Sequence, residues 1–100
     1  MEEKNKNIVP KISFKSVEVQ DLNGKDYSLD ISKTVADLIY NKSSSVDMLE
    51  IARSINKGEE VILTDELESE INKNVVPNLL AFAVVGIQNK IKQANSNGTV

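Results

Sequence analysis

The chain has 100 residues, a formal net charge of −3, and ordinary fractions of hydrophobic (40%) and charged (27%) residues. That length accommodates one domain with one modest core, and the composition argues against disorder throughout. The chain contains neither cysteine nor histidine. Their absence excludes disulfides, thiolate or imidazole metal sites, cysteine nucleophiles and Ser-His-Asp triads.

The charge is unevenly distributed along the chain. Residues 1–15 carry four lysines and two glutamates, residues 16–70 carry 13 acids and five bases, and residues 71–100 carry three lysines and no acid. An acidic middle argues against a nucleic-acid-binding face there, because phosphate binding depends on clustered lysine and arginine. Arg53 is the only arginine. We therefore do not expect nucleic acid as the principal partner.

The order of polar and apolar segments predicts a flexible arm over residues 1–10, a single α+β domain over 11–94 and a frayed tail over 95–100. The arm is polar and of mixed charge, unlike a signal peptide. The longest apolar run, Leu79 to Ile87, has nine residues, against the roughly 20 that cross a bilayer. We expect a soluble protein with no membrane partner.

Residues 11–31 predict a β-hairpin. Ile12 and Phe14 alternate in one phase, and Val17 and Val19 alternate in the other. The change of phase indicates a β-bulge near residues 15–16, or a strand covered on different faces at its two ends.

The turn of this hairpin contains Asn23-Gly24, a strong hairpin signal. A three-residue loop over 22–24 would place apolar residues opposite each other on one face, pairing Val19 with Tyr27 and Val17 with Leu29. A two-residue loop would instead set apolar against polar side chains. We therefore predict the three-residue loop, with Gly24 in the left-handed conformation.

Two short helices are predicted next. Ser32 is the expected N-cap of a helix that ends near Asn41. The pattern from Ser44 to Asp47 fits a capping box that opens a second helix, and Gly58 is expected to end it.

Residues 61–63 then predict a short strand that could add a third strand to the hairpin. Thr64 is the expected N-cap of a last helical stretch to about Gln93. This stretch contains Pro77, which should kink or split it near Asn74. The fold class is thus α+β, with a hairpin packed against three or four helices.

Candidate chemical sites are weak. The hairpin turn resembles a fragment of a calcium loop, but Gly24 would fall at position four of that loop instead of six, and a turn explains it better. The serines at 43–45 are accounted for by helix capping.

An acidic cluster surrounds the short strand and could perform acid–base catalysis or hold Mg²⁺, although such a cluster is more commonly a solvated surface. Its members are Glu59, Glu60, Asp65, Glu66, Glu68 and Glu70. We expect a non-enzymatic protein that needs no cofactor or metal.

The stretch from Val75 to Ile91 is apolar on nearly all sides. One stripe with helical spacing is expected to face the domain's own core, and consists of Leu80, Val84, Ile87 and Ile91. The remaining apolar residues form a second face that we predict to be an interface between copies in a homo-oligomer: Leu79, Phe82, Ala83, Val85 and Gly86. The alternative is a central helix wrapped entirely within one subunit.

Four segments resemble small prophage or mobile-element proteins of unassigned function: residues 12–21, Asn23-Gly24, residues 38–41 and residues 61–64. The resemblance implies a virion-assembly or accessory role, and a cytoplasmic or virion-associated location. The leading hypothesis is therefore a structural or interaction protein, with a phage or mobile-element structural protein as a further partner.

Two alternatives remain. A nucleic-acid-associated regulator would use the basic arm at Lys4, Lys6, Lys11 and Lys15. A small metal- or phosphate-dependent enzyme would use the acidic cluster.

Overall fold

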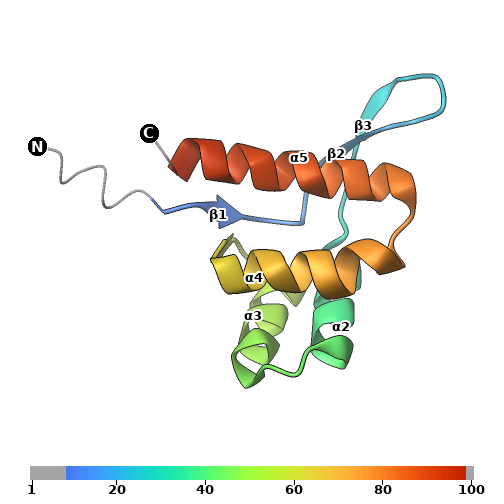
Figure 1. Cartoon of the computed structure of the whole chain (residues 1–100). Coiled ribbons are helices and arrows are strands. Elements are labelled where there is room, and N and C mark those ends of the chain that lie inside the picture. The colour runs from blue at the N-terminus through green and yellow to red at the C-terminus, as the bar shows by residue number, and fades with distance from the viewer. Residues whose placement is uncertain (1–8, 99–100) are drawn as a thin grey trace, which may run out of the picture.

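The computed structural model describes residues 9–98 and confirms the α+β class. In chain order, the described elements are β1 (Lys11–Ile12), β2 (Val17–Gln20), β3 (Asp26–Leu29), α2 (Ser32–Lys42), α3 (Val46–Asn56), β4 (Val61–Ile62), α4 (Asp65–Glu70), η1 (Ile71–Val75), η2 (Val76–Asn78) and α5 (Ala81–Gly98). Figure 1 shows α5 and the α4–η2 segment on opposite sides of β1, with α2 and α3 below.

The strands form two separate two-stranded antiparallel sheets, β1 with β4 and β2 with β3. The strand near residues 61–63 therefore does not extend the hairpin; it pairs with β1 instead. β1 ends at Ile12, and β2 begins at Val17 in the other sheet. The change of phase in the apolar alternation therefore reflects the passage of the chain from one sheet to the other, instead of a β-bulge. Ile12, Phe14, Val17 and Val19 are all buried on this path.

The hairpin register agrees with the three-residue loop. Val17 pairs with Leu29 and Val19 with Tyr27, and the Asp21 N–H donates to the Lys25 carbonyl at 3.0 Å. Gly24 has φ +82°, the left-handed conformation that glycine adopts most readily. Val17 and Val19 thus face the core, whereas on the partner strand Leu29 is partly buried and Tyr27 remains exposed.

Helix capping follows the predictions only in part. Thr64 caps α4, since its hydroxyl accepts from the Leu67 N–H at 3.1 Å, and Gly58 follows the end of α3 with φ +82°. Ser32 is not an N-cap, because it is the first residue within α2 and is buried. Nor does Ser44 cap α3: that helix begins at Val46, and no side chain caps it.

Pro77 splits the last helical stretch instead of kinking it. The helix widens to a π turn in η1, tightens to a 3-10 turn in η2 that contains Pro77, and ends where Leu79 becomes extended. The chain then reverses, so that α5 runs back along β1 and β2 (Figure 1). α5 continues to Gly98, past the predicted boundary at 94.

One core joins both sheets and all helices. Its members include Phe14, Ile39, Met48, Ile71 and Ile87, all at most 1% exposed. Pro10, predicted to lie in the arm, belongs to this body because its carbonyl accepts from the Leu63 N–H at 2.8 Å. Residues 1–8 of the predicted arm lie outside the described residues.

Candidate functional site

Helix α5 presents two faces, divided differently from the prediction. Ala83, Gly86, Ile87, Ile91 and Ala94 are buried against the subunit's own core. The opposite side is exposed at Phe82, Val85, Asn89, Lys92 and Ser96. These exposed positions alternate at spacings of three and four residues, the a/d spacing of a coiled-coil seam. We call them the α5 seam.

Two of the predicted interface residues face inward. A Cβ built on Gly86 would lie 2.7 Å from the Glu18 carbonyl oxygen and 2.8 Å from Cγ1 of Val17 and of Val19. The absence of a side chain at Gly86 is therefore explained by close packing of α5 on β2 within one subunit. Ala83 is 6% exposed on the same side. Neither residue is available to a second copy.

The remaining predicted residues are divided between core and surface. Leu79 is partly buried and packs on the core, whereas Phe82 and Val85 are 40% and 57% exposed. Leu80, predicted to face the core, is 72% exposed, because the extended conformation at Leu79 interrupts the helix before it. Leu80, Phe82 and Val85 are thus exposed apolar residues close together in the chain at the start of α5, and Phe82 and Val85 line one groove. We call the three residues the end patch.

A groove borders this patch on the hairpin side. It encloses about 450 Å³ and is lined by Phe82, Val85 and Asn89 of α5 and, from the hairpin, by Glu18, Val19, Gln20, Asp21 and Asp26. We call it the acidic groove. Strand pairing sets Glu18 and Gln20 on the hairpin face opposite to Val17 and Val19, so two of these polar residues project away from the core.

The acidic residues of the groove are engaged only by neutral groups. Glu18 accepts from the Ser28 hydroxyl at 2.6 Å, Asp26 from the Gln20 amide at 3.0 Å, and Asp21 from the N–H groups of Asn23 and Lys25, both at 2.9 Å. Within residues 9–98, no ion pair involves any of the three carboxylates. The groove therefore offers negative charge that no ion pair within these residues neutralises, beside an apolar patch, although Lys92 lines a neighbouring depression with Glu18.

Lysines gather on another face, where α2 begins and α3 ends. Lys15, Lys33 and Lys57 line a depression of about 220 Å³, with Asp30 among them. A neighbouring cleft of about 530 Å³ between α2 and α3 shares Lys33, and contains Tyr40 and Arg53. The Arg53 guanidinium lies 5.7 Å from the Tyr40 ring and 3.0 Å from the Glu50 carboxylate. Sequence charge counts missed this group because its lysines are far apart in the chain.

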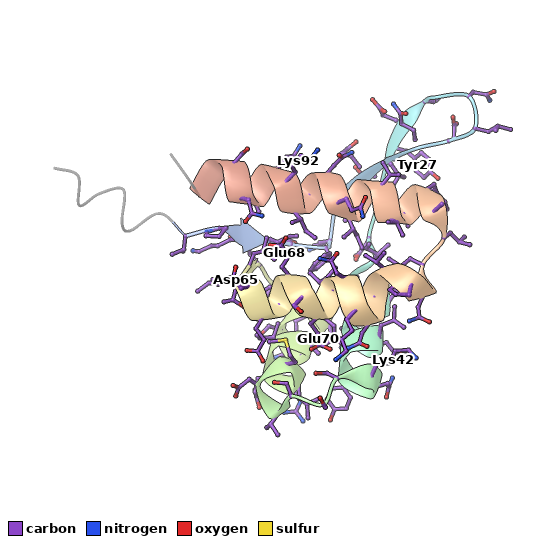
Figure 2. The ribbon with its side chains drawn as sticks, viewed as in Figure 1. Tyr27, Lys42, Asp65, Glu68, Glu70 and Lys92 are labelled. Atoms are coloured by element: carbon purple, nitrogen blue, oxygen red, sulfur yellow. The ribbon has the colours of Figure 1, made fainter. Side chains whose placement is uncertain are left out.

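The predicted acidic cluster does not converge. Figure 2 shows Asp65, Glu68 and Glu70 pointing in different directions from α4. Glu66 accepts from the Ser45 hydroxyl at 3.1 Å and Glu68 from the Asn95 amide at 3.4 Å, while Glu70 is bonded by Asn74. Across residues 9–98, no three carboxylates lie together in a way that could hold a metal ion.

The serines before α3 and the two tyrosines take structural positions. Ser43 accepts from the Ser45 N–H at 3.0 Å in the turn before α3. Tyr27 in β3 and Tyr40 in α2 are 38% and 44% exposed. No helix within the described part of the chain has the length and apolar character needed to cross a bilayer.

Comparison of the chain with protein-family models, with curated proteins and with solved structures found no match. The function must therefore be argued from the surface itself.

Proposed function

We propose that this chain is a non-enzymatic interaction protein that acts as a homo-oligomer, and that the end patch is its docking surface. The observation that carries the proposal is the exposure of three large apolar side chains at the start of α5, Leu80, Phe82 and Val85, of which the last two line one groove. Clustered large apolar side chains rimmed by polar residues are typical of protein–protein contacts. Each would gain from burial at roughly 25 cal/mol per Å².

The acidic groove supports the same assignment. An interface commonly combines an apolar centre with a polar rim, and the charged rim determines which partner fits. The groove places Glu18, Asp21 and Asp26 beside Phe82 and Val85. The assembly or accessory role implied by the resemblance to prophage proteins is compatible with such a surface and stays a prediction.

Light scattering coupled to size-exclusion chromatography, over a range of protein concentrations, tests the proposal. Phe82→Glu should shift the parent oligomer to a smaller species while helical circular dichroism is kept. Val46→Glu is the matched control, because Val46 is 77% exposed on α3 and lies outside the patch. A parent that is monomeric at every concentration, or equal effects of both variants, would contradict the proposal.

A second candidate function is nucleic-acid binding, favoured by the grouping of Lys15, Lys33 and Lys57 around one depression. Of the four lysines predicted to serve this role, Lys15 lines the depression, Lys11 lies in β1 and does not line it, and Lys4 and Lys6 lie outside the described residues. Titration of a labelled oligonucleotide at low and high salt tests it, since phosphate binding weakens steeply with salt. Lys15→Glu should abolish binding that Lys42→Glu leaves intact; no binding at low salt removes this candidate.

A further inference from the structure

The α5 seam is chemically different at its two ends. Its first half carries Phe82 and Val85, which line the acidic groove together with Asn89. Its second half carries Lys92 and Ser96, which line a second depression where Glu18 is the acidic residue. From residue 71 to the end, the chain contains three lysines and no acid. Figure 2 shows Lys92 projecting from α5 well along the helix from the hairpin. Ten residues of α-helix separate Phe82 from Lys92, about 15 Å.

We propose that the occupant of the end patch and acidic groove is the second half of α5 from another copy of this chain, in an antiparallel, two-fold pair. This inference rests on the proposed function and specifies its partner. A two-fold interface must be self-complementary. Antiparallel pairing about a point between Val85 and Asn89 satisfies that condition, because it sets each end of the seam against the opposite end of the other.

In this arrangement Phe82 lies opposite the partner's Lys92, and Val85 lies opposite the partner's Asn89. A lysine can cover apolar surface with its methylene stem while its ammonium group stays polar. The Lys92 stem would pack on Phe82, and its ammonium would reach Glu18, Asp21 and Asp26. No ion pair within residues 9–98 engages Lys92 or these carboxylates, so no existing ion pair would have to break.

Charge disfavours the parallel alternative. Parallel pairing would stack Phe82 on Phe82 and Val85 on Val85, but it would also set Lys92 against Lys92 and bring two acidic grooves together. Like charges placed opposite each other oppose association. Antiparallel pairing replaces both repulsions with attractions, and it does so twice in each dimer.

Cysteine cross-linking tests the orientation directly, because the chain has no native cysteine. Val85→Cys and Asn89→Cys proteins are mixed and oxidised, and the disulfides are identified by mass spectrometry. Antiparallel pairing predicts mainly the mixed 85–89 disulfide. Predominant 85–85 and 89–89 products would overturn it. Val46→Cys, exposed on α3, controls for random collision.

Charge reversal tests the contact between Lys92 and the groove. Lys92→Glu should raise the dissociation constant about tenfold or more, since it sets a carboxylate against carboxylates. Adding Asp26→Lys to the same chain should restore association, because each copy then offers the reversed pair. Lys42→Glu changes the charge equally at the exposed end of α2 and should have no effect.

These outcomes separate the two proposals. Association that Phe82→Glu disrupts but Lys92→Glu leaves unchanged would retain the docking surface and overturn the antiparallel pair. A parent that never associates would overturn both.

Discussion

Gly86 lies against the backbone of Glu18, so close that a Cβ on Gly86 would come within 2.7 Å of the Glu18 carbonyl oxygen. Antiparallel strands with a free edge expose such carbonyls, and here α5 covers that edge of β2. The same contact brings α5 beside the hairpin and thereby forms the acidic groove. The absence of a side chain at Gly86 therefore permits the close approach of α5 to β2 beside which the candidate docking surface lies.

Gly86→Ala should destabilise the fold even though alanine is the better helix former by about 1 kcal/mol. The added methyl group would overlap a carbonyl oxygen and two valine methyl groups, and overpacking of this kind costs about 1–3 kcal/mol. Urea unfolding measures the change. Gln88→Ala, at an exposed position of the same helix outside the α5 seam, is the control and should cost little; equal stability of both variants would contradict the close packing.

Gly24→Val should also destabilise, for a different reason. No atom lies within 4 Å of the position a Cβ would occupy, so the entire cost comes from φ +82°, which a β-branched residue adopts poorly. We expect a loss of about 1–3 kcal/mol, measured by thermal or urea denaturation. Gly24→Asn should lose much less, because asparagine tolerates this conformation. A melting temperature unchanged in Gly24→Val would contradict the loop.

Leu80→Glu should leave the subunit folded, contrary to the expectation from helical spacing, because Leu80 is 72% exposed. Ile87→Glu should unfold it, because Ile87 is fully buried and an unpaired buried charge is strongly unfavourable. Circular dichroism of the two variants at one concentration distinguishes them. If Leu80→Glu unfolds the protein as Ile87→Glu does, the two-faced assignment of α5 is wrong.

Acid should weaken the start of α2. The Ser32 N–H donates to Asp30 Oδ1 at 3.0 Å, and this bond, together with the charges of Lys15 and Lys33, holds the pKa of Asp30 below its usual value. A lowered pKa means that the ionised form is favoured in the folded state. Its contribution is therefore present above the usual pKa, near 3.8, and is lost as the pH falls through the folded value.

Asp30→Asn keeps the acceptor oxygen and removes the charge, so its unfolding free energy should fall less steeply between about pH 5 and 2 than that of the parent. Urea unfolding across this range measures both slopes. Glu60→Gln removes an exposed carboxylate elsewhere and serves as the control. Identical slopes for the parent and Asp30→Asn would show that Asp30 does not contribute.

Much of the local structure was predictable from short-range patterns. The alternation of apolar and polar residues in the two strands was enough to predict the hairpin register, which pairs Val17 with Leu29 and Val19 with Tyr27. A shift of the register by one residue would exchange the two faces of a strand. Thr64 was predictable as a cap, and Gly58 as a helix end. Ser32 was not: the Asp30 carboxylate already accepts from the N–H at the start of α2, and Ser32 itself is carried into the core.

The candidate site was predictable in kind but only partly in its residues. The last helix contains more apolar residues than one core-facing stripe requires, and Phe82 and Val85 are among the additional ones. A helix that is apolar on nearly all sides must also be buried on a side other than the core-facing one. The sequence did not distinguish Ala83 and Gly86, which are buried, from these exposed residues. The spacing of apolar residues along the helix does not indicate that β2 packs against that side of α5.

The amino-acid sequence by itself determined the local elements of this protein: the hairpin and its turn, the break at Pro77, and an apolar excess in the last helix. Neighbouring residues and periodicity suffice for these. Only the tertiary structure decided that β4 pairs with β1, that Leu80 faces outward, and that Glu18, Asp21 and Asp26 adjoin Phe82. These relations depend on how the chain reverses after Leu79 and packs α5 on β2. Long-range contacts of this kind cannot be inferred from the spacing of apolar and polar residues along the chain.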